Sequence, residues 1–377
     1  MSFALPTIVA ICGDAGGANA LAPVIELLFA EGQVSVTAFA YLQARTLWAE
    51  RGLDFLEISG DLDTAGILSL LRQAKAGLVL TGTSVNRYEL EKGFVAAARQ
   101  LHIPSLAVLD FWANYALRFS DAGGRLSYLP DRIAVMDEQA RTEMTGEGID
   151  EGLIVITGHP ALDSLEAYRS NFLPTRRAAI RQELGISEEE LLVLFASQPA
   201  SCFENPMEVP PPWLDRDRVL KSLLSALEEL QRQYRKRIVL AVRPHPRENT
   251  QFFDRIVSHS IRVIHQAGGE ARGIAMSADL VVGMETMYLV EAAYLGLATL
   301  SIRLDLPLPD TFPPNRSGLT YPIYREDGIK PAVEKMLFCQ NLPRASTHSA
   351  LPHDASRNIA KLAYQMMHPQ IRNTEGA

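Results

Sequence analysis

Short apolar runs alternate with longer amphipathic segments along the whole chain, and this alternation limits the fold more than any other feature. Short apolar runs bounded by turns are typical of the buried strands of a parallel sheet, and helices cover such a sheet on both faces. The pattern therefore predicts an α/β fold. The predicted strands are Thr7–Cys12, Ser35–Tyr41, Gly77–Leu80, Ser105–Leu109, Arg132–Val135, Leu153–Thr157, Leu191–Ala196, Ile238–Val242, Ile261–Ile264, Leu280–Val282 and Ala298–Ile302.

The segments between these strands have the spacing of amphipathic helices. In one of them Leu90, Phe94 and Ala98 recur at helical intervals, so one face of that helix is expected to pack on the sheet. The predicted helices are Ala18–Glu31, Leu42–Arg51, Thr64–Ala74, Tyr88–Leu101, Glu138–Glu147, Arg176–Leu184, Val219–Arg235, Asn249–Ser258, Ala271–Met276, Met287–Leu295, Lys330–Phe338 and Ser356–His368.

The length of 377 residues indicates two domains, because a domain typically has about 100–200 residues. The sheet pattern pauses over Gly158–Thr175. We therefore expect a first Rossmann-like domain over residues 1–165, a second over 166–355, and a C-terminal helix and tail over 356–377.

Composition excludes several functional classes. The formal net charge of −8 argues against a broad nucleic-acid surface. Cys12, Cys202 and Cys339 have no CxxC spacing, and the histidines have no HExxH grouping, so neither a disulfide framework nor a metal site is expected. The sequence also lacks the roughly 18–20 consecutive apolar residues that span a bilayer. These features predict a cytoplasmic protein.

Two polar segments follow strands in the first half. Asp14, Gly16, Gly17 and Asn19 lie in a glycine-rich run after Thr7–Cys12. Glycines there permit a tight turn and a close approach of backbone N–H groups to a ligand, whereas a plain strand-to-helix turn is the alternative. The run lacks the GxGxxG spacing of a dinucleotide fingerprint.

The other segment is Asp110–Tyr115, which follows the strand Ser105–Leu109. Its aspartate and aromatic rings suit a sugar, with hydrogen bonds at the edge of the ring and stacking on its face. Asp110 is also a candidate general base for an acceptor hydroxyl. The alternative is an aromatic cluster that fills space between the domains. The hydroxyls of Thr81–Ser84 suit either a sugar or a helix cap.

Two further segments follow strands in the second half. Arg243, His245 and Arg247 are separated by prolines and form a compact positive site suited to phosphate, unless they form a solvated basic turn. Glu285 and Thr286 come after Leu280–Val282, directly before a predicted helix whose N-terminus is suited to a pyrophosphate.

Glu291 lies farther along the same predicted helix. Its carboxylate could accept hydrogen bonds from ribose hydroxyls. A helix cap followed by a surface glutamate is the alternative for this segment.

These segments resemble a known superfamily. Ile154–Asp163 resembles the domain junction of UDP-N-acetylglucosamine 2-epimerases and related GT-B enzymes, Arg243–Glu248 is similar to a phosphate-binding segment of capsule-polymer transferases, and Ser277–Gly296 is similar to the superfamily's donor site. Met284 and Glu285 stand where the family usually has small residues. The resemblance implies two Rossmann-like domains facing across a cleft, with the C-terminal helix returning to the first domain.

The resemblance also implies roles for the candidate residues. Arg243, Arg247, Glu285, Thr286 and Glu291 would bind a nucleotide-sugar donor. Asp14, Gly16, Gly17 and Asn19 would lie on the acceptor side, and Asp110 and His245 are the candidate catalytic residues.

The expected function is a metal-independent glycosyltransferase that moves a sugar from a nucleotide-sugar to an acceptor hydroxyl in surface-polysaccharide or glycoconjugate synthesis. No cofactor, no nucleic-acid partner and no membrane span are expected, and the acceptor is a glycan or a small molecule. The alternatives are a nucleotide-sugar 2-epimerase or hydrolase, and a non-catalytic nucleotide-binding protein. The oligomeric state stays open.

Overall fold

The structure is a computed structural model. It describes residues 5–198, 211–245, 248, 253, 256–265, 268–307, 309–310, 312–316, 318–339 and 354–368. The chain divides into two compact units, each described by itself. Unit 1 comprises Met1–Asp163 and Ala350–Ala377, and unit 2 comprises Ser164–Ser349.

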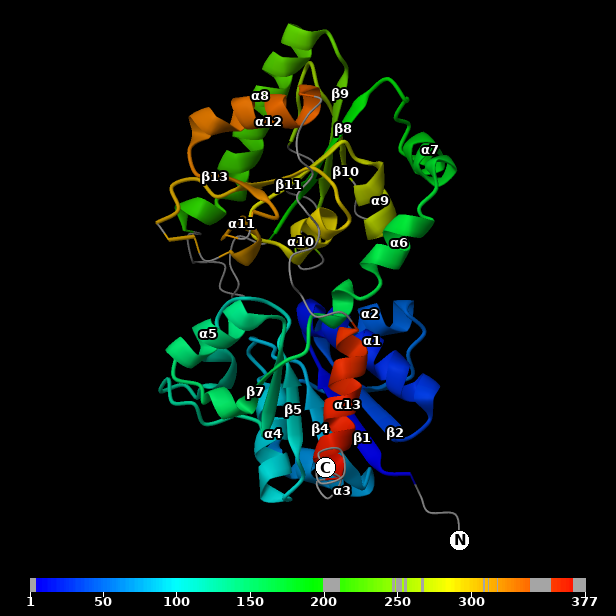
Figure 1. The fold of residues 1–377 in the computed structure, drawn as a ribbon, viewed down its shortest axis with the longest axis vertical. Helices are drawn as coiled ribbons and strands as arrows, with labels where there is room; N and C mark the ends of the chain where they lie inside the picture. Colours follow the sequence, from blue (N-terminus) through cyan, green and yellow to red (C-terminus); the bar gives the residue numbers. More distant parts are fainter. Residues whose placement is uncertain are drawn as a thin grey trace, which may run out of the picture. The chain divides into compact units, whose positions relative to one another are not determined.

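Unit 1 contains a seven-stranded sheet in which every pairing is parallel (Figure 1, blue to green, with the C-terminal helix in red). The strand order is β3-β2-β1-β4-β5-β6-β7. The strands are β1 Thr7–Cys12, β2 Ser35–Ala40, β3 Leu56–Glu57, β4 Ala76–Thr81, β5 Ser105–Val108, β6 Arg132–Val135 and β7 Ile154–Ile156. The helices are α1 Ala15–Glu31, α2 Leu42–Glu50, α3 Thr64–Gln73, α4 Leu90–Gln100, α5 Glu138–Gly146 and α13 Ala355–Met367.

Both faces of the unit 1 sheet are covered. Ile8 and Ala10 of β1 join the apolar core with α1 and α13, whereas Val9 and Ile11 join the core with α3 and α4. All four side chains are fully buried. Burial of a side chain of the size of isoleucine stabilises a fold by roughly 1.5–3 kcal/mol. The apolar strand β1 is therefore stable at the centre of a sheet that helices cover on both faces.

Unit 2 repeats the arrangement with a six-stranded parallel sheet of order β10-β9-β8-β11-β12-β13. Its strands are β8 Leu191–Ala196, β9 Ile238–Arg243, β10 Arg262–His265, β11 Leu280–Gly283, β12 Thr299–Ile302 and β13 Tyr321–Ile323. Its helices are α6 Leu165–Asn171, α7 Pro174–Glu183, α8 Arg216–Tyr234, α9 Ala271–Ser277, α10 Met287–Tyr294, α11 Pro313–Arg316 and α12 Ile329–Phe338.

In both sheets the strand order reverses between two neighbouring strands, which are β1 and β4 in unit 1 and β8 and β11 in unit 2. Helices leaving such a pair diverge to opposite faces of the sheet. Ligands of open α/β sheets bind at this point, outside the carboxyl ends of the strands. The topology therefore directs attention to the residues that follow these four strands.

The structure corrects several predicted elements. The edge strands β3 and β13 were not predicted, because β3 is short and exposed and β13 contains Pro322, which is tolerated only at a sheet edge. The prolines of Leu306–Ser317 are typical of a surface loop, but Asp310 and Phe312 within it are buried and α11 lies there. Most of the predicted helix Asn249–Ser258 lies outside the described residues.

The C-terminal helix α13 belongs to unit 1, where it packs against α1 and β4. Asp163, the last residue of unit 1 before unit 2, anchors its first turn. The Asp163 carboxylate accepts hydrogen bonds from the N–H groups of Ala355 (2.8 Å) and Ser356 (2.7 Å) and from the Ser356 hydroxyl (2.7 Å). A carboxylate at this position satisfies backbone donors that the helix itself cannot.

We predict that Asp163→Ala lowers the free energy of unfolding of unit 1 by about 1–2 kcal/mol, because it removes this N-terminal cap. Urea unfolding followed by circular dichroism measures the change. The matched control is Asp354→Asn. Asp354 directly precedes α13 in a left-handed conformation that asparagine also adopts, and within the described helix its side chain makes no capping hydrogen bond. Equal effects of the two substitutions would contradict the assignment.

Candidate functional site

The helix α1 begins at Ala15, three residues earlier than predicted, so Gly16 and Gly17 lie in its first turn. These glycines therefore do not form the expected turn. A Cβ atom on Gly16 would overlap the Oδ2 atom of Asp110, and one on Gly17 would lie 2.8 Å from the Sγ atom of Cys12. The glycines permit close packing of Cys12 of β1 and of Asp110, which follows β5, against the start of the helix.

The predicted residues Asp14 and Asn19 flank these glycines. Asp14 precedes α1, and its carboxylate accepts hydrogen bonds from the Val85 N–H and the Asn86 side chain, both at 3.2 Å. The loops after β1 and β4 are thereby joined at the point where the strand order reverses. Asn19 lies farther along α1 and is exposed.

Asp110 follows β5, and the structure brings its carboxylate to the α1 N-terminus. Its Oδ1 atom accepts hydrogen bonds from the Thr83 hydroxyl (3.1 Å) and the Arg118 guanidinium (2.6 Å). Arg118 is only 8 % exposed and also donates to the carbonyl oxygens of Thr83 and Ala113. A buried guanidinium in this position holds the orientation of the Asp110 carboxylate.

His159 contacts the backbone of Asp110. Its Nε2 atom lies 3.0 Å from the carbonyl oxygen of Asp110, and its Nδ1 atom accepts the Ala161 N–H at 3.3 Å. Because a carbonyl oxygen only accepts, Nε2 carries the proton, and these two contacts fit the neutral imidazole. His159 thus positions Asp110.

Two of the three aromatic residues after Asp110, Trp112 and Tyr115, do not form the expected sugar platform. Trp112 and Tyr115 are 4 % and 3 % exposed. The Trp112 indole donates to Asp137 at 2.8 Å, and the Tyr115 hydroxyl donates to Glu143 at 2.6 Å. Their faces are packed inside unit 1, so the stacking interpretation of these two rings was wrong.

The first turn of α4 contains a buried carboxylate, Glu91, that the sequence analysis did not identify. Glu91 is buried beneath the β1–α1 loop, and its carboxylate accepts hydrogen bonds from the Gly13 N–H (2.9 Å), the Tyr41 hydroxyl (2.5 Å) and the Ser84 hydroxyl (2.5 Å). Ser84 in turn accepts the Asp14 N–H at 3.1 Å. Burial raises the pKa of Glu91 to about 7, against the hydrogen bonds that lower it.

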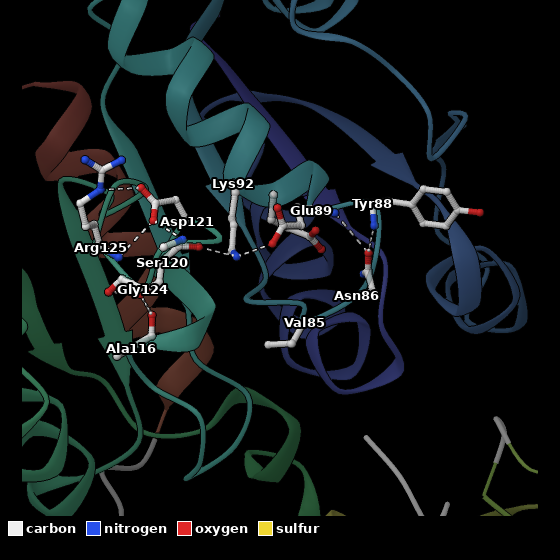
Figure 2. Close-up of polar contacts among 12 residues, drawn as sticks. Val85, Asn86, Tyr88, Glu89, Lys92, Ala116, Ser120, Asp121, Gly124 and Arg125 are labelled. Atoms are coloured by element: carbon white, nitrogen blue, oxygen red, sulfur yellow. Dashed lines mark hydrogen bonds and ion pairs between the residues drawn. The ribbon is translucent and has the colours of Figure 1, made fainter. Parts of the chain in front are cut away.

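The neighbouring Lys92 points to a different loop. Figure 2 shows its ammonium group between Glu89 (2.6 Å) and the Ser120 carbonyl oxygen (2.7 Å). The loop that it holds contains Arg118, the partner of Asp110. Glu91 therefore holds the loop that carries Asp14, and Lys92 holds the loop that carries Arg118, the partner of Asp110.

A sequence signal for Glu91 existed. It lies three residues before Phe94 and four before Val95, on the face predicted to be apolar. A charged residue on such a face needs buried partners.

In unit 2, the predicted donor segment surrounds the start of α10. Thr286 is the N-cap, and its hydroxyl accepts the Tyr288 N–H at 3.3 Å, as the capping alternative expects. The Arg243 guanidinium, at the end of β9, lies over the Tyr288 ring at 5.6 Å and donates to the Gly268 carbonyl oxygen at 3.1 Å. A cation thus lies beside a capped helix N-terminus, an arrangement suited to an anion.

Glu291 lies on α10, one turn beyond Thr286. Its carboxylate accepts a hydrogen bond at 3.1 Å from Arg272 of α9, and Arg272 also donates to the Ser164 hydroxyl at 2.7 Å. Glu291 is partly exposed, so a ligand hydroxyl can reach it only beside this ion pair.

Glu285 precedes Thr286 and forms an ion pair with Arg303, which follows β12. Arg303 is 2 % exposed and also pairs with Asp310. Sequence reasoning identified Glu285 but missed Arg303 and Asp310. The sequence could have indicated Arg303, because this charged residue directly follows a predicted apolar strand. Arg243, which was predicted, follows a strand in the same way.

The remaining basic segment is described only in part. The His245 N–H donates to Glu248 at 2.7 Å, and Glu248 also accepts from Ser197 (2.9 Å) and Arg216 (2.7 Å). The backbone of His245 is therefore held near the carboxyl ends of β8 and β9. The predicted donor residue Arg247 lies outside the described residues.

Neither a metal centre nor a membrane span is evident in the described part of the chain. No group of three or more His, Cys, Asp or Glu side chains there is placed to hold a metal ion. None of the described helices combines the length and the apolar character needed to cross a bilayer.

Solved structures with the same architecture include UDP-N-acetylglucosamine 2-epimerases. The chain superposes on a Staphylococcus aureus MnaA–UDP structure with a TM-score of 0.69 at 15% identity, covering 96% of both chains. Methanocaldococcus jannaschii UDP-GlcNAc 2-epimerase gives 0.68 at 17% identity, covering 95% of this chain and 99% of that one. Acinetobacter baumannii MurG gives 0.56 at 14% identity, covering 96% and 99%.

This chain has the GT-B fold. Its two Rossmann-like α/β domains confirm the predicted fold class. No model of a protein family matches the sequence, and no curated protein sequence matches it. At these low identities the GT-B likeness establishes the fold, and the chemistry has to be argued from the residues.

We predict that Gly16→Ala and Gly17→Ala each lower the free energy of unfolding by about 1–3 kcal/mol, because the added methyl group overlaps Asp110 or Cys12. Gly146→Ala in α5 is the matched control, since no described atom lies within 4 Å of its added Cβ. Alanine favours a helix, so the control is expected to be neutral or stabilising by up to about 1 kcal/mol. Thermal unfolding of the three variants measures the difference, and stabilisation by Gly16→Ala would contradict the packing role.

We predict a pH-dependent stability difference between the protein and Glu91→Gln. The folded-state pKa of Glu91 is raised to about 7 from 4.5, so the folded chain binds this proton more tightly than the unfolded chain. Its contribution is fully present below about pH 4.5 and is lost as the pH rises to about 7. Relative to Glu91→Gln, the protein should lose on the order of 3 kcal/mol over this window. Urea unfolding of both proteins at pH 5 and pH 8 measures the loss, and parallel pH profiles would contradict it.

Proposed function

We propose that the protein is a metal-independent glycosyltransferase that takes its sugar from a nucleotide-sugar. The observation that carries the proposal is the position of Arg243 over Tyr288 in the first turn of α10. The helix N-terminus and the guanidinium together offer a phosphate group backbone donors and a positive charge. The same groups would stabilise negative charge on the departing nucleotide.

The nucleoside would lie farther along α10. Glu291 would accept hydrogen bonds from ribose hydroxyls, and its ion pair with Arg272 holds the carboxylate in place for this contact. The fold comparisons support a nucleotide ligand, because two of the matching proteins were solved with UDP or UDP-GlcNAc bound.

Asp110 would act on the acceptor hydroxyl from unit 1. Arg118 and Thr83 occupy its Oδ1 atom, and Oδ2 lies against Gly16 at the start of α1. These contacts fix the orientation of the carboxylate, which suits it to accept a hydrogen bond or a proton from a hydroxyl. Asp14, joined to the loop after β4, would help to orient the acceptor.

A second candidate is a nucleotide-sugar 2-epimerase or hydrolase, and the UDP-N-acetylglucosamine 2-epimerases among the matching structures support it. Such a reaction needs no acceptor. Incubation of the protein with nucleotide-sugars alone therefore separates the candidates. A new nucleotide-sugar indicates an epimerase and free sugar indicates a hydrolase, whereas turnover only after addition of an acceptor indicates a transferase. Binding without any turnover indicates a binding protein.

We predict that Arg243→Ala weakens nucleotide binding by about tenfold to a hundredfold, as expected for loss of one charge-assisted hydrogen bond. The matched control is Arg262→Ala. Arg262 also donates to a backbone carbonyl oxygen, but it begins β10 at the opposite end of the same sheet. Isothermal titration calorimetry with nucleoside phosphates and nucleotide-sugars measures both variants.

Glu291→Ala should weaken binding of the same ligands, but it should not weaken binding of inorganic pyrophosphate, because pyrophosphate has no ribose. If the unaltered protein, Arg243→Ala and Arg262→Ala bind nucleotides with equal affinity, the assignment of the nucleotide site to unit 2 is wrong.

A further inference from the structure

Glu285 places a carboxylate next to the N-terminus of α10, the end of the helix that the proposed function assigns to a phosphate. It immediately precedes the N-cap Thr286 and follows the end of β11. Its own N–H donates to Gln198 at 2.8 Å, so this amide is used inside the protein and does not face a ligand. A fixed negative charge beside a helix N-terminus competes with a bound anion for the same favourable field.

Arg303 neutralises this charge only in part. The adjacent strands β11 and β12 align Gly283 with Ser301, and two residues farther along Glu285 meets Arg303. The same guanidinium pairs with Asp310, so two carboxylates share one cation. The three residues, termed here the Glu285 cluster, therefore carry one net negative charge when both carboxylates are ionised.

The rest of the cluster is rigid. Asp310 accepts hydrogen bonds from the Phe312 N–H (2.8 Å), the Asn315 amide (2.7 Å) and the Tyr324 hydroxyl (2.8 Å). Arg303 and Asp310 are 2 % and 6 % exposed. Since Asp310 is held by these donors, Arg303 cannot turn toward a ligand without leaving a buried carboxylate uncompensated, which is costly.

The other described charges of the site nearly cancel. Arg272 is paired with Glu291, and Arg216 is paired with Glu248. In the described part of the chain, Arg243 lies beside Tyr288 of α10 and forms no ion pair with a carboxylate. Its one charge balances the Glu285 cluster, so the described site is close to neutral. A nearly neutral site offers little attraction for a second negative charge, whereas removing that charge from water is costly, so the site favours a monoanion over a dianion.

We propose that Glu285 is a specificity determinant that matches the unit 2 site to a single phosphate, so that the donor is a nucleoside monophosphate sugar and not a nucleoside diphosphate sugar. This inference rests on the proposed function. A sugar linked through one phosphodiester carries one negative charge, whereas a pyrophosphate linkage carries two. The second phosphate would have to approach the Glu285 carboxylate at the edge of the same helix N-terminus.

The test compares nucleoside monophosphates and diphosphates of each common base by isothermal titration calorimetry, together with the corresponding monophosphate- and diphosphate-linked sugars. We expect the protein to bind the monophosphate forms of its preferred base at least as tightly as the diphosphate forms. In Glu285→Gln and Glu285→Ser, affinity for the diphosphate forms should rise by about tenfold relative to the monophosphate forms, because one nearby negative charge is gone. Raising the ionic strength should reduce this change.

The matched control is Glu229→Gln, which alters the net charge equally on the exposed surface of α8, away from the α10 N-terminus. Its ligand preference should be that of the unaltered protein. Glu285→Gln retains the side-chain shape, and circular dichroism of both Glu285 variants establishes that they are folded.

Diphosphate forms bound at least tenfold more tightly than monophosphate forms by the unaltered protein would overturn the inference, but the nucleotide site would stand. An unchanged preference in folded Glu285→Gln and Glu285→Ser would also overturn it. No binding of any nucleotide or nucleotide-sugar would overturn the proposed function together with this inference.

Discussion

Each parallel sheet has to be covered on both faces, and this requirement decides where polar chemistry is possible in the chain. The interior strand positions are apolar and fully buried, as Val9 and Ala10 on opposite faces of β1 illustrate. Polar groups are left to the ends of the strands, where the chain leaves the sheet. The reversal of strand order then separates two loops at each switch point, and the candidate residues Asp14 and Thr286 lie in such loops.

The two candidate regions hold their charges by different means. In unit 1, buried side chains hold the loops that carry the candidate residues. Glu91 binds the backbone of the β1–α1 loop, and Arg118 binds the carboxylate of Asp110. In unit 2, ion pairs link neighbouring strand ends and helices, as Glu285 with Arg303 and Glu291 with Arg272 do. Buried charges of either kind are costly unless each one is paired and hydrogen-bonded, so these networks define one arrangement of the loops more than they add stability.

Most of the fold could be predicted from the sequence, because strands buried on both faces leave uninterrupted apolar runs. The predicted strands Thr7–Cys12, Arg132–Val135 and Leu191–Ala196 agree with β1, β6 and β8 residue for residue. The edge strands β3 and β13 leave no such signal. The packing role of Gly16 could not be predicted, because the side chain that lies against it, Asp110, is distant in sequence and meets it only in the folded sheet.

The sequence indicated which segments carry the candidate site residues. It did not indicate which side chains those residues contact. Residues that follow strands were recognised, whereas their partners lie in segments that the sequence pattern assigns to loops, such as Arg118 and Asp310. Glu91 is intermediate, since its place on an apolar helix face was visible but its three donors come from loops of unrelated sequence.

The position of α13 has a consequence for how the chain is made. Unit 2 is contiguous from Ser164 to Ser349, whereas unit 1 includes a helix that is translated after all of unit 2. During synthesis the earlier part of unit 1 leaves the ribosome with the surface of α1 and β4 that α13 will cover still open to water. Unit 2 can therefore complete its core first, although it emerges second. Until α13 is released, the nascent chain presents an apolar face that a chaperone could shield.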